Sequence, residues 1–282
     1  MTIDAKMRTQ TQNPKSTAIT WETIFCGDLT ELDDWGDWLT TPYNLEFSVA
    51  LDWRDYWAKS RNEFDHTILE NLVERLVQLP QLVALSLQCL EVLDLSALAK
   101  LSNLTALLVQ LDSMSDRELV LYYSKLFPKP KPALNIASLA ALSNLKKLSL
   151  DSSNISDISP LANLVNLECL WLDNNRISDI KPLANLVNLK ELHLSNNQIS
   201  NLAPLANLGK LQRLFLSNNK IADISPLAKL GKLGKLGGLY LNGNEIVDVS
   251  PLAELGNVKV LDLNDNKIVD FTAIAGLDCV KI

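Results

Sequence analysis

The hydrophobic positions of this chain repeat every 22 residues over its C-terminal two thirds. In one unit the apolar residues are Leu189, Leu192, Leu194, Ile199, Leu202, Leu205 and Leu208, with Asn197 among them. The same pattern starts 22 residues earlier at Leu167 and 22 residues later at Leu211. A fixed period of this length is typical of a solenoid, in which each unit buries its apolar face only against its neighbours. The pattern therefore predicts a stack of short units with large open surfaces, which favours binding over catalysis.

Each unit contains the elements of one coil. The Leu-x-Leu pair predicts a short strand whose side chains alternate between the core and the open side. Segments such as Ile180 to Leu183 predict turns or short 3₁₀ pieces on the opposite side, because proline there suits a turn and would be poor inside a central strand.

The run Leu-x-x-Leu-x-Leu-x-x-Asn-x-Ile-x-x-Ile-x-Pro-Leu-x-x-Leu resembles the 22-residue leucine-rich repeats of bacterial internalins and of the leucine-rich regulatory subunit of protein phosphatase 1. Eight copies begin at Leu82, Leu104, Leu145, Leu167, Leu189, Leu211, Leu236 and Val258. The resemblance implies an α/β fold class, a right-handed leucine-rich-repeat solenoid with a parallel concave sheet and a convex side of 3₁₀ pieces and turns. Internalins imply adhesion to a host surface and the phosphatase subunit implies intracellular regulation. The repeat itself does not choose between them.

The asparagine of the repeat resembles the family's asparagine ladder, whose side chains satisfy backbone groups in the turn after each strand. Its members here are Asn175, Asn197, Asn219, Asn244 and Asn266. Leu90, Asp112 and Ser153 occupy this position in the first three repeats, so we expect those repeats to be less regular.

The pattern divides the chain into a polar tail at 1–20, expected to be disordered, a cap at 21–81 and the repeat domain at 82–282. Five of the six tryptophans lie in the cap, where residues 43–51 predict a strand and residues 63–79 an amphipathic helix. We expect this α/β cap to cover the apolar end of the solenoid, as terminal units must. The alternative is a small enzymatic activity in the 21–81 region.

Two interruptions break the period. An insertion at 113–135 carries a capping-box pattern and predicts a helix over roughly 116–126, ending before Pro128. A duplicated Gly-Lys-Leu at 231–236 is expected to be neutral. At the C-terminus, no polar cap follows the last repeat, so we expect Ile274, Leu277 and Val280 to be partly exposed and open to self-association or to cover by a partner.

Composition narrows the function classes. The net charge of −7 argues against a nucleic-acid partner, and the absence of an apolar run near 18 residues argues against membrane insertion. The first 20 residues lack a signal-peptide core, and the four cysteines are far apart, which favours reduced thiols in a cytoplasm.

Candidate catalytic chemistry is sparse. The only histidines are His66 and His193, and neither lies in a nucleophile, metal or phosphate-loop pattern. We expect Asp94, Asp151, Asp173 and Glu191 to be ordinary polar positions of a solenoid, solvated and not catalytic. We expect Cys169 to have no lowered thiol pKa, because no basic residue neighbours it at the right spacing. No catalytic residue, metal site or cofactor is therefore predicted.

The residue between the two strand leucines forms a column on the open side. Four consecutive members carry rings, namely Trp171, His193, Phe215 and Tyr240, and Asp262 follows. At a strand spacing of about 4.8 Å these rings should form one stripe roughly 14 Å long, pointing to solvent.

Glu191, Arg213 and Asp173 border the stripe. An aromatic centre with a mixed-charge border is typical of a protein-binding surface. The sequence thus predicts a non-enzymatic interaction module that binds a partner protein on its concave face. The structural alternative is that aromatic residues simply make good strand residues.

Overall fold

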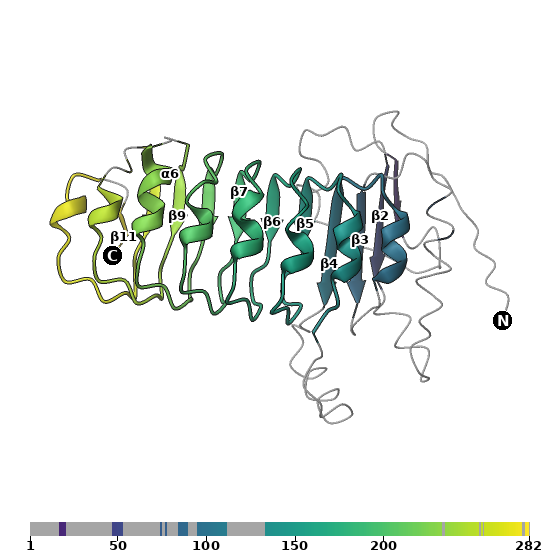
Figure 1. Ribbon diagram of the computed structural model, residues 1–282, viewed down its shortest axis with the longest axis horizontal. Coiled ribbons are helices and arrows are strands. Elements are labelled where there is room, and N and C mark those ends of the chain that lie inside the picture. The colour runs from purple at the N-terminus through teal and green to yellow at the C-terminus, as the bar shows by residue number, and fades with distance from the viewer. Residues whose placement is uncertain are drawn as a thin grey trace, which may run out of the picture.

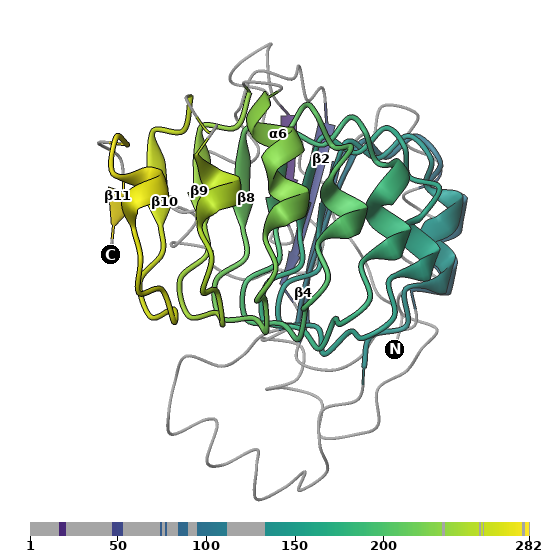
Figure 2. The same cartoon turned by 60° about the vertical axis from the view of Figure 1, so that its left-hand side comes forward.

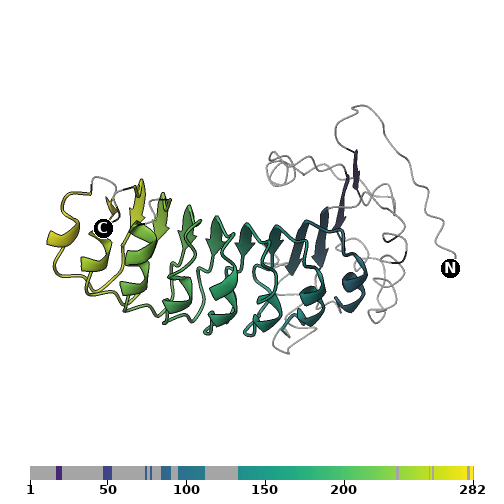
Figure 3. The same ribbon diagram turned by 45° about the horizontal axis from the view of Figure 1, so that its top comes forward.

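The computed structural model describes residues 17–20, 47–52, 74, 77, 84–89, 95–111, 133–232, 235–253, 255, 257–277 and 280–281. These residues form an elongated solenoid (Figure 1). Its strands line one side of the stack and its short helices the opposite side (Figure 3). The predicted leucine-rich-repeat solenoid is confirmed.

The described strands make one parallel 11-stranded sheet in which every strand pairs with its neighbour in sequence. The strands are β1 Thr17–Thr20, β2 Phe47–Asp52, β3 Ala84–Cys89, β4 Ala106–Leu111, β5 Lys147–Ser149, β6 Cys169–Trp171, β7 Glu191–His193, β8 Arg213–Phe215, β9 Gly238–Tyr240, β10 Val260–Asp262 and β11 Val280–Lys281. The eight expected repeats supply β3 to β10. The sheet extends beyond them by β1, β2 and β11.

The convex side consists of 3₁₀ helices, as the Ile-x-Pro-Leu segments predict. They are η1 Ser96–Lys100, η2 Ala137–Ala141, η3 Ser159–Leu161, η4 Lys181–Asn185, η5 Ala203–Leu205, η6 Ser225–Leu227, η7 Ser250–Leu252 and η8 Thr272–Ile274. In the 25-residue repeat, η6 continues directly into the α-helix α6, Ala228–Lys232. The three extra residues thus lengthen one convex segment (Figure 2).

The leucine pattern fills one continuous core between the sheet and the 3₁₀ helices. Leu192 and Leu194 of one coil, and Leu205 and Leu208 of its convex side, are all fully buried. Burying one such side chain contributes about 2 kcal/mol. Each coil depends on the next for this burial, which is why the repeat must be stacked to be stable.

The asparagine ladder lies at the turn that ends each later strand. Asn197 donates from Nδ2 to the carbonyl oxygens of Leu172 (2.9 Å) and Leu194 (3.1 Å), and its Oδ1 accepts from Ile177 N (2.9 Å). Asn175, Asn219, Asn244 and Asn266 make equivalent bonds. The residue before each ladder asparagine is left-handed, with φ between 55° and 58° at Asn174, Asn196, Asn218 and Asp265 and 71° at Gly243. This turn stops the strand after three residues.

The less regular N-terminal repeats differ in strand length. β3 and β4 each extend over six residues, up to the position before Leu90 and Asp112. In both repeats the ladder asparagine is missing, and the strand continues to the place where the turn would begin. Ser153 is intermediate: it is fully buried, and its backbone N–H donates to Oδ1 of Asn175 (3.2 Å).

Several sequence expectations need correction. Residues 17–20, assigned to a disordered tail, form β1, because Thr-Ala-Ile-Thr suits a strand and pairs in parallel with β2. Leu134, assigned to the insertion, is already in the core and bonds from its N–H to Ser153 O (3.1 Å). Ile274 is buried, not partly exposed, since η8 turns it inward; Leu277 and Val280 are partly exposed as expected.

The remaining expectations concern two predicted helices and one predicted strand. The predicted helix at 116–126 lies outside the described residues, as does that at 63–79 apart from Glu74 and Val77. The strand expected at 43–51 is observed as β2 at Phe47–Asp52.

Candidate protein-binding face

The open side of the sheet carries the predicted column of rings. Strand register pairs Trp171 with His193, His193 with Phe215 and Phe215 with Tyr240. In each strand the central leucine points into the core, so its two neighbours point to the open side. We call Trp171, His193, Phe215 and Tyr240 the aromatic stripe.

The rings of the stripe contact one another. Ring centroids are 5.8 Å apart between Trp171 and His193, with a 37° tilt. They are 3.9 Å apart between His193 and Phe215 and 4.4 Å between Phe215 and Tyr240, where the planes are within 5° of parallel. Strands about 4.8 Å apart bring flat side chains in one column to stacking distance. The stripe is thus one stack three rings long, with Trp171 leaning on its end.

Stacking changes the expected exposure of these side chains. All four residues are half-buried, because each ring covers part of the next. The expectation that the rings simply point to solvent is wrong for the central ones. Phe215 has a stacked ring on each face, so its loss removes two contacts of about 0.5–1.5 kcal/mol each.

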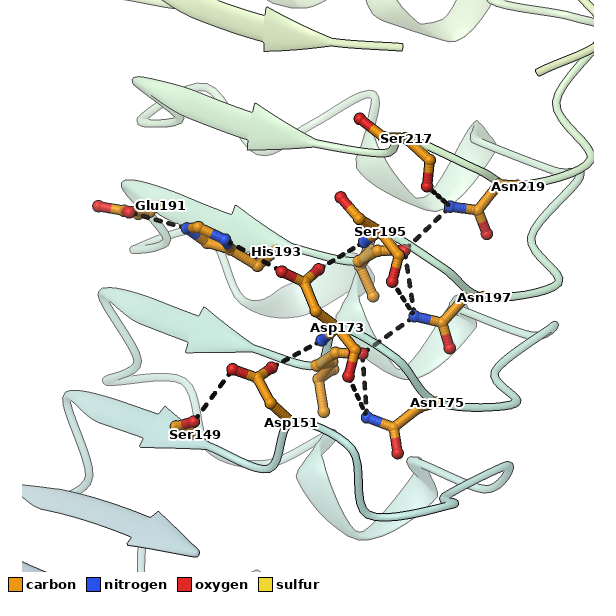
Figure 4. A network of polar contacts seen from close by, with 12 residues as sticks. Ser149, Asp151, Asp173, Asn175, Glu191, His193, Ser195, Asn197, Ser217 and Asn219 are labelled. Atoms are coloured by element: carbon orange, nitrogen blue, oxygen red, sulfur yellow. Dashed lines mark hydrogen bonds and ion pairs between the residues drawn. The ribbon is translucent and has the colours of Figure 1, made fainter. Parts of the chain in front are cut away.

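A chain of polar contacts lies beside the stripe (Figure 4). Nδ1 of His193 is 3.4 Å from Oδ2 of Asp173, and Nε2 is 2.8 Å from Oε1 of Glu191. The other Glu191 oxygen pairs with a guanidinium N–H of Arg213. The other Asp173 oxygen accepts from Ser195 N at 2.5 Å. The bordering residues are therefore joined to one another through the histidine.

The chain of contacts continues to Asp151 on the preceding coil. Its Oδ1 accepts from Asp173 N (2.7 Å), and Oδ2 from the Ser149 hydroxyl (3.5 Å). Burial and the nearby Asp173 charge raise the pKa of Asp151 to about 6. The expectation that Asp151, Asp173 and Glu191 are ordinary solvated carboxylates is wrong, because all three are partly buried and hydrogen-bonded.

The charges of this network shift the pKa values of its own members, His193 and Glu191. Burial alone would lower the pKa of His193, but the hydrogen bonds and charges of Asp173 and Glu191 outweigh it and raise that pKa above 6.5. Burial alone would raise the pKa of Glu191, but the His193 hydrogen bond and the Arg213 charge hold it below 4.5. The network therefore favours a charged imidazolium between two carboxylates.

Cys169 lies on the open side, next to Glu191 in the column that begins each strand. Burial, followed by the Glu191 charge, raises the pKa of its thiol to about 11. The thiol is therefore protonated at neutral pH and is a poor nucleophile, in agreement with the sequence expectation.

A glycine lies beside the C-terminal end of the stripe. A Cβ added at Gly238 would lie 3.4 Å from Cε2 of Tyr240 and 3.6 Å from Cγ of Arg213. These are ordinary van der Waals distances, so the tyrosine ring and the arginine stem pack directly over the glycine and would also leave room for an alanine. Asp262 follows Tyr240 in the column and accepts from Asn264 N (3.2 Å) and Nδ2 (2.8 Å).

A second set of asparagines was missed by sequence reasoning. Nδ2 of Asn144, Asn166 and Asn188 donates to the carbonyl oxygens of Ser102, Ser143 and Val165 respectively, each at 2.8–2.9 Å. We call these three residues the rim asparagines. Their constant place in Leu-x-Asn-Leu was the available signal, but an exposed asparagine in a loop is not distinctive by itself.

The described part of the chain contains no helix long and apolar enough to cross a membrane. Nor do three His, Cys, Asp or Glu side chains come together there in a metal-binding arrangement.

Comparison with known proteins agrees with the fold. A family model described as leucine-rich repeats (2 copies) matches residues 143–185 and 187–229. No curated protein sequence matches the chain. Among solved structures, internalin C2 of Listeria monocytogenes is 38% identical, with 69% of this chain and 73% of that chain covered and a TM-score of 0.54.

Two more distant structures share the fold alone. The Listeria monocytogenes internalin inlF is 24% identical, with 95% of this chain and 85% of that chain covered and a TM-score of 0.59. A leucine-rich-repeat protein of Leptospira interrogans is 22% identical, with 74% of this chain and 57% of that chain covered and a TM-score of 0.54. From its repeats and its likeness to internalin C2, the chain belongs to the leucine-rich-repeat family and shares the 22-residue repeat of the internalins.

Proposed function

We propose that this protein is a non-enzymatic interaction module that binds a partner protein across the aromatic stripe of its concave face. The observation that carries the proposal is the unbroken row of four rings on the open side of the sheet, bordered by charged groups. The family supports it at a coarser level, since leucine-rich repeats are protein-interaction modules.

Within this proposal the residues divide into two roles. Trp171, Phe215 and Tyr240 supply contact area, because large rigid rings bury much surface with few rotors to freeze. Glu191, Arg213 and Asp173 set the orientation of the stripe and its partner, and Asp262 marks its C-terminal end. Truncating one contact ring should cost about 2 kcal/mol of binding, roughly a thirtyfold loss of affinity.

Two kinds of partner are compatible with this proposal. Control of a partner enzyme in the cytoplasm follows from the likeness to the phosphatase subunit and from the cysteine pattern. The 38% identity to an internalin favours the alternative, an internalin-like surface adhesin. Labelling of intact host cells with a membrane-impermeant reagent separates the two, because only the adhesin would be labelled.

The test is capture from a lysate of the native host by immobilised wild-type protein, Trp171→Ala and Val187→Ala, with mass spectrometry of the bound proteins. Val187 is an exposed apolar residue, 47% accessible, and lies outside the stripe. We expect one set of proteins to be retained by wild type and Val187→Ala and lost with Trp171→Ala. Equal retention by all three variants would contradict the proposal.

A further inference from the structure

His193 occupies the centre of the aromatic stripe and has an acceptor at each ring nitrogen. Nδ1 faces Asp173 at 3.4 Å and Nε2 faces Glu191 at 2.8 Å. The Nε2–Glu191 contact is a hydrogen bond, and the Nδ1–Asp173 contact is a longer ion pair. Ionised carboxylates only accept hydrogen bonds, and a neutral imidazole has a single N–H to donate. Only the doubly protonated ring presents an N–H to each carboxylate, so this placement favours an imidazolium.

We propose that protonated His193 is a clamp that holds the aromatic stripe in its binding geometry, so that partner binding is controlled by the protonation of this one residue. The inference rests on the proposed function of the stripe. In it His193 is a positioning residue: its two polar contacts fix the plane of the ring, and that plane sets the stacking of Phe215 and the tilt of Trp171.

Loss of the proton breaks one side of the clamp. The shorter bond, from Nε2 to Glu191, is the one that a single remaining N–H retains, and Arg213 continues to neutralise Glu191. Asp173 then loses its partner and keeps only the bond from Ser195 N. The ring is then held by one polar contact in place of two and turns more easily about its side-chain torsions, which loosens the centre of the stack.

The groups packed around His193 define the pH window. Asp173 and Glu191 face the ring directly, Asp151 and Arg213 act through them, and Cys169 on β6 stays neutral. Because the carboxylates raise the pKa of His193, the clamp forms at pH values below that raised pKa and is lost as pH rises through it. One unit above that pKa about a tenth of the molecules are protonated, so affinity should fall about tenfold.

The first experiment needs no partner. The chain has only two histidines, so proton–carbon NMR of the Cε1 positions in wild type and His66→Gln assigns the His193 signal directly. We expect a His193 pKa above 6.5 that falls in Asp173→Asn and in Glu191→Gln, and a Phe215 ring signal that shifts with the same midpoint. A pKa of 6.5 or below, or one unchanged in both variants, would overturn the clamp.

The second experiment uses the protein captured from the host lysate as the probe. It is loaded at pH 6 on immobilised wild type, His193→Gln and Asp157→Asn, and released by steps to pH 8.5. Asp157 is an exposed carboxylate outside the stripe and serves as the control. We expect wild type and Asp157→Asn to release the protein in one step at the His193 pKa, and His193→Gln to show no such step.

The two experiments test the His193 clamp separately from the proposed binding function of the stripe. A release curve that is identical in wild type and His193→Gln would overturn the proton control while leaving the stripe as the binding site. Capture that does not depend on Trp171 would remove the proposed function, whereas the NMR titration would still report whether the clamp exists.

Discussion

The asparagine ladder and the aromatic stripe are two columns of the same repeat. The ring is the last residue of its strand, and the ladder asparagine lies in the turn that follows. The five ladder members are identical, four of them are buried and Asn266 is partly buried, and each bonds the backbone of two coils. The stripe is half-buried, its members differ, and they contact one another through their rings. The fold requires an asparagine at every later turn, but nothing in the backbone requires a ring at the last position of each strand. The ladder therefore serves the fold, and the stripe is the part of the repeat to which we assign partner binding in our proposal.

The largest expected effect is on the ladder. Asn197→Ala leaves the Ile177 N–H buried without its partner, at about 1–3 kcal/mol. The carbonyl groups of Leu172 and Leu194 each lose one bond, worth about 0.5–1.5 kcal/mol, and keep the one from Asn175 or Asn219. We expect about 3 kcal/mol of lost stability by denaturant unfolding. Asn207→Ala, at an exposed position, is the control and should change stability by less than about 0.5 kcal/mol. Similar losses in both variants would show that the ladder bonds contribute little.

Truncating a ring of the stripe should cause an intermediate loss of stability, larger for a central ring than for the ring at the end. Phe215→Ala removes two stacking contacts and is expected to cost about 1–3 kcal/mol of stability. Trp171→Ala removes one tilted contact and should cost about 1 kcal/mol. Thermal unfolding of the two variants measures the difference. A larger loss for Trp171→Ala would contradict the stacked arrangement.

The rim asparagines allow a sharper comparison with the ladder, because they make a similar bond at an exposed place. Asn188→Ala removes one bond to Val165 O and one contact from Lys210. Water can replace both partners, so we expect a loss of about 0.5–1 kcal/mol, well below that of Asn197→Ala. Urea unfolding of both variants under the same conditions decides the order.

The last expected effect is the dependence of stability on pH. A group whose pKa is raised on folding stabilises the fold while it is protonated in both states. His193 should therefore contribute below pH 6.5, and this contribution should disappear as pH rises through its raised pKa. Asp151, raised to about 6, should cause a separate decline between about pH 4 and 6. Unfolding free energies against pH should lose the lower step in Asp151→Asn and the upper step in His193→Gln.

Much of this architecture follows from the sequence, because the period alone fixes which residues share a column. Strand register confirms that Trp171, His193, Phe215 and Tyr240 lie side by side. The period does not fix side-chain torsions. The stacking of the rings and the seating of His193 between Asp173 and Glu191 depend on those torsions and on contacts between columns, so they could not be predicted.

The ends of the solenoid were harder to predict for another reason. β1 and β11 gain their pairing from a neighbouring strand and not from a repeat pattern of their own. Ile274 is buried because η8 closes over the last coil, whereas the sequence reasoning treated the end as open. Self-association through the C-terminal end stays a prediction. It is testable by sedimentation at high concentration.

The most direct test of the account is the affinity of the captured partner for Trp171→Ala and Asn197→Ser, measured by calorimetry at a temperature where both variants are folded. The account predicts about a thirtyfold loss of affinity for Trp171→Ala with a loss of only about 1 kcal/mol of stability, and nearly wild-type affinity for Asn197→Ser despite its lower melting temperature. Wild-type affinity in Trp171→Ala would contradict it and would mean that the rings serve the fold alone.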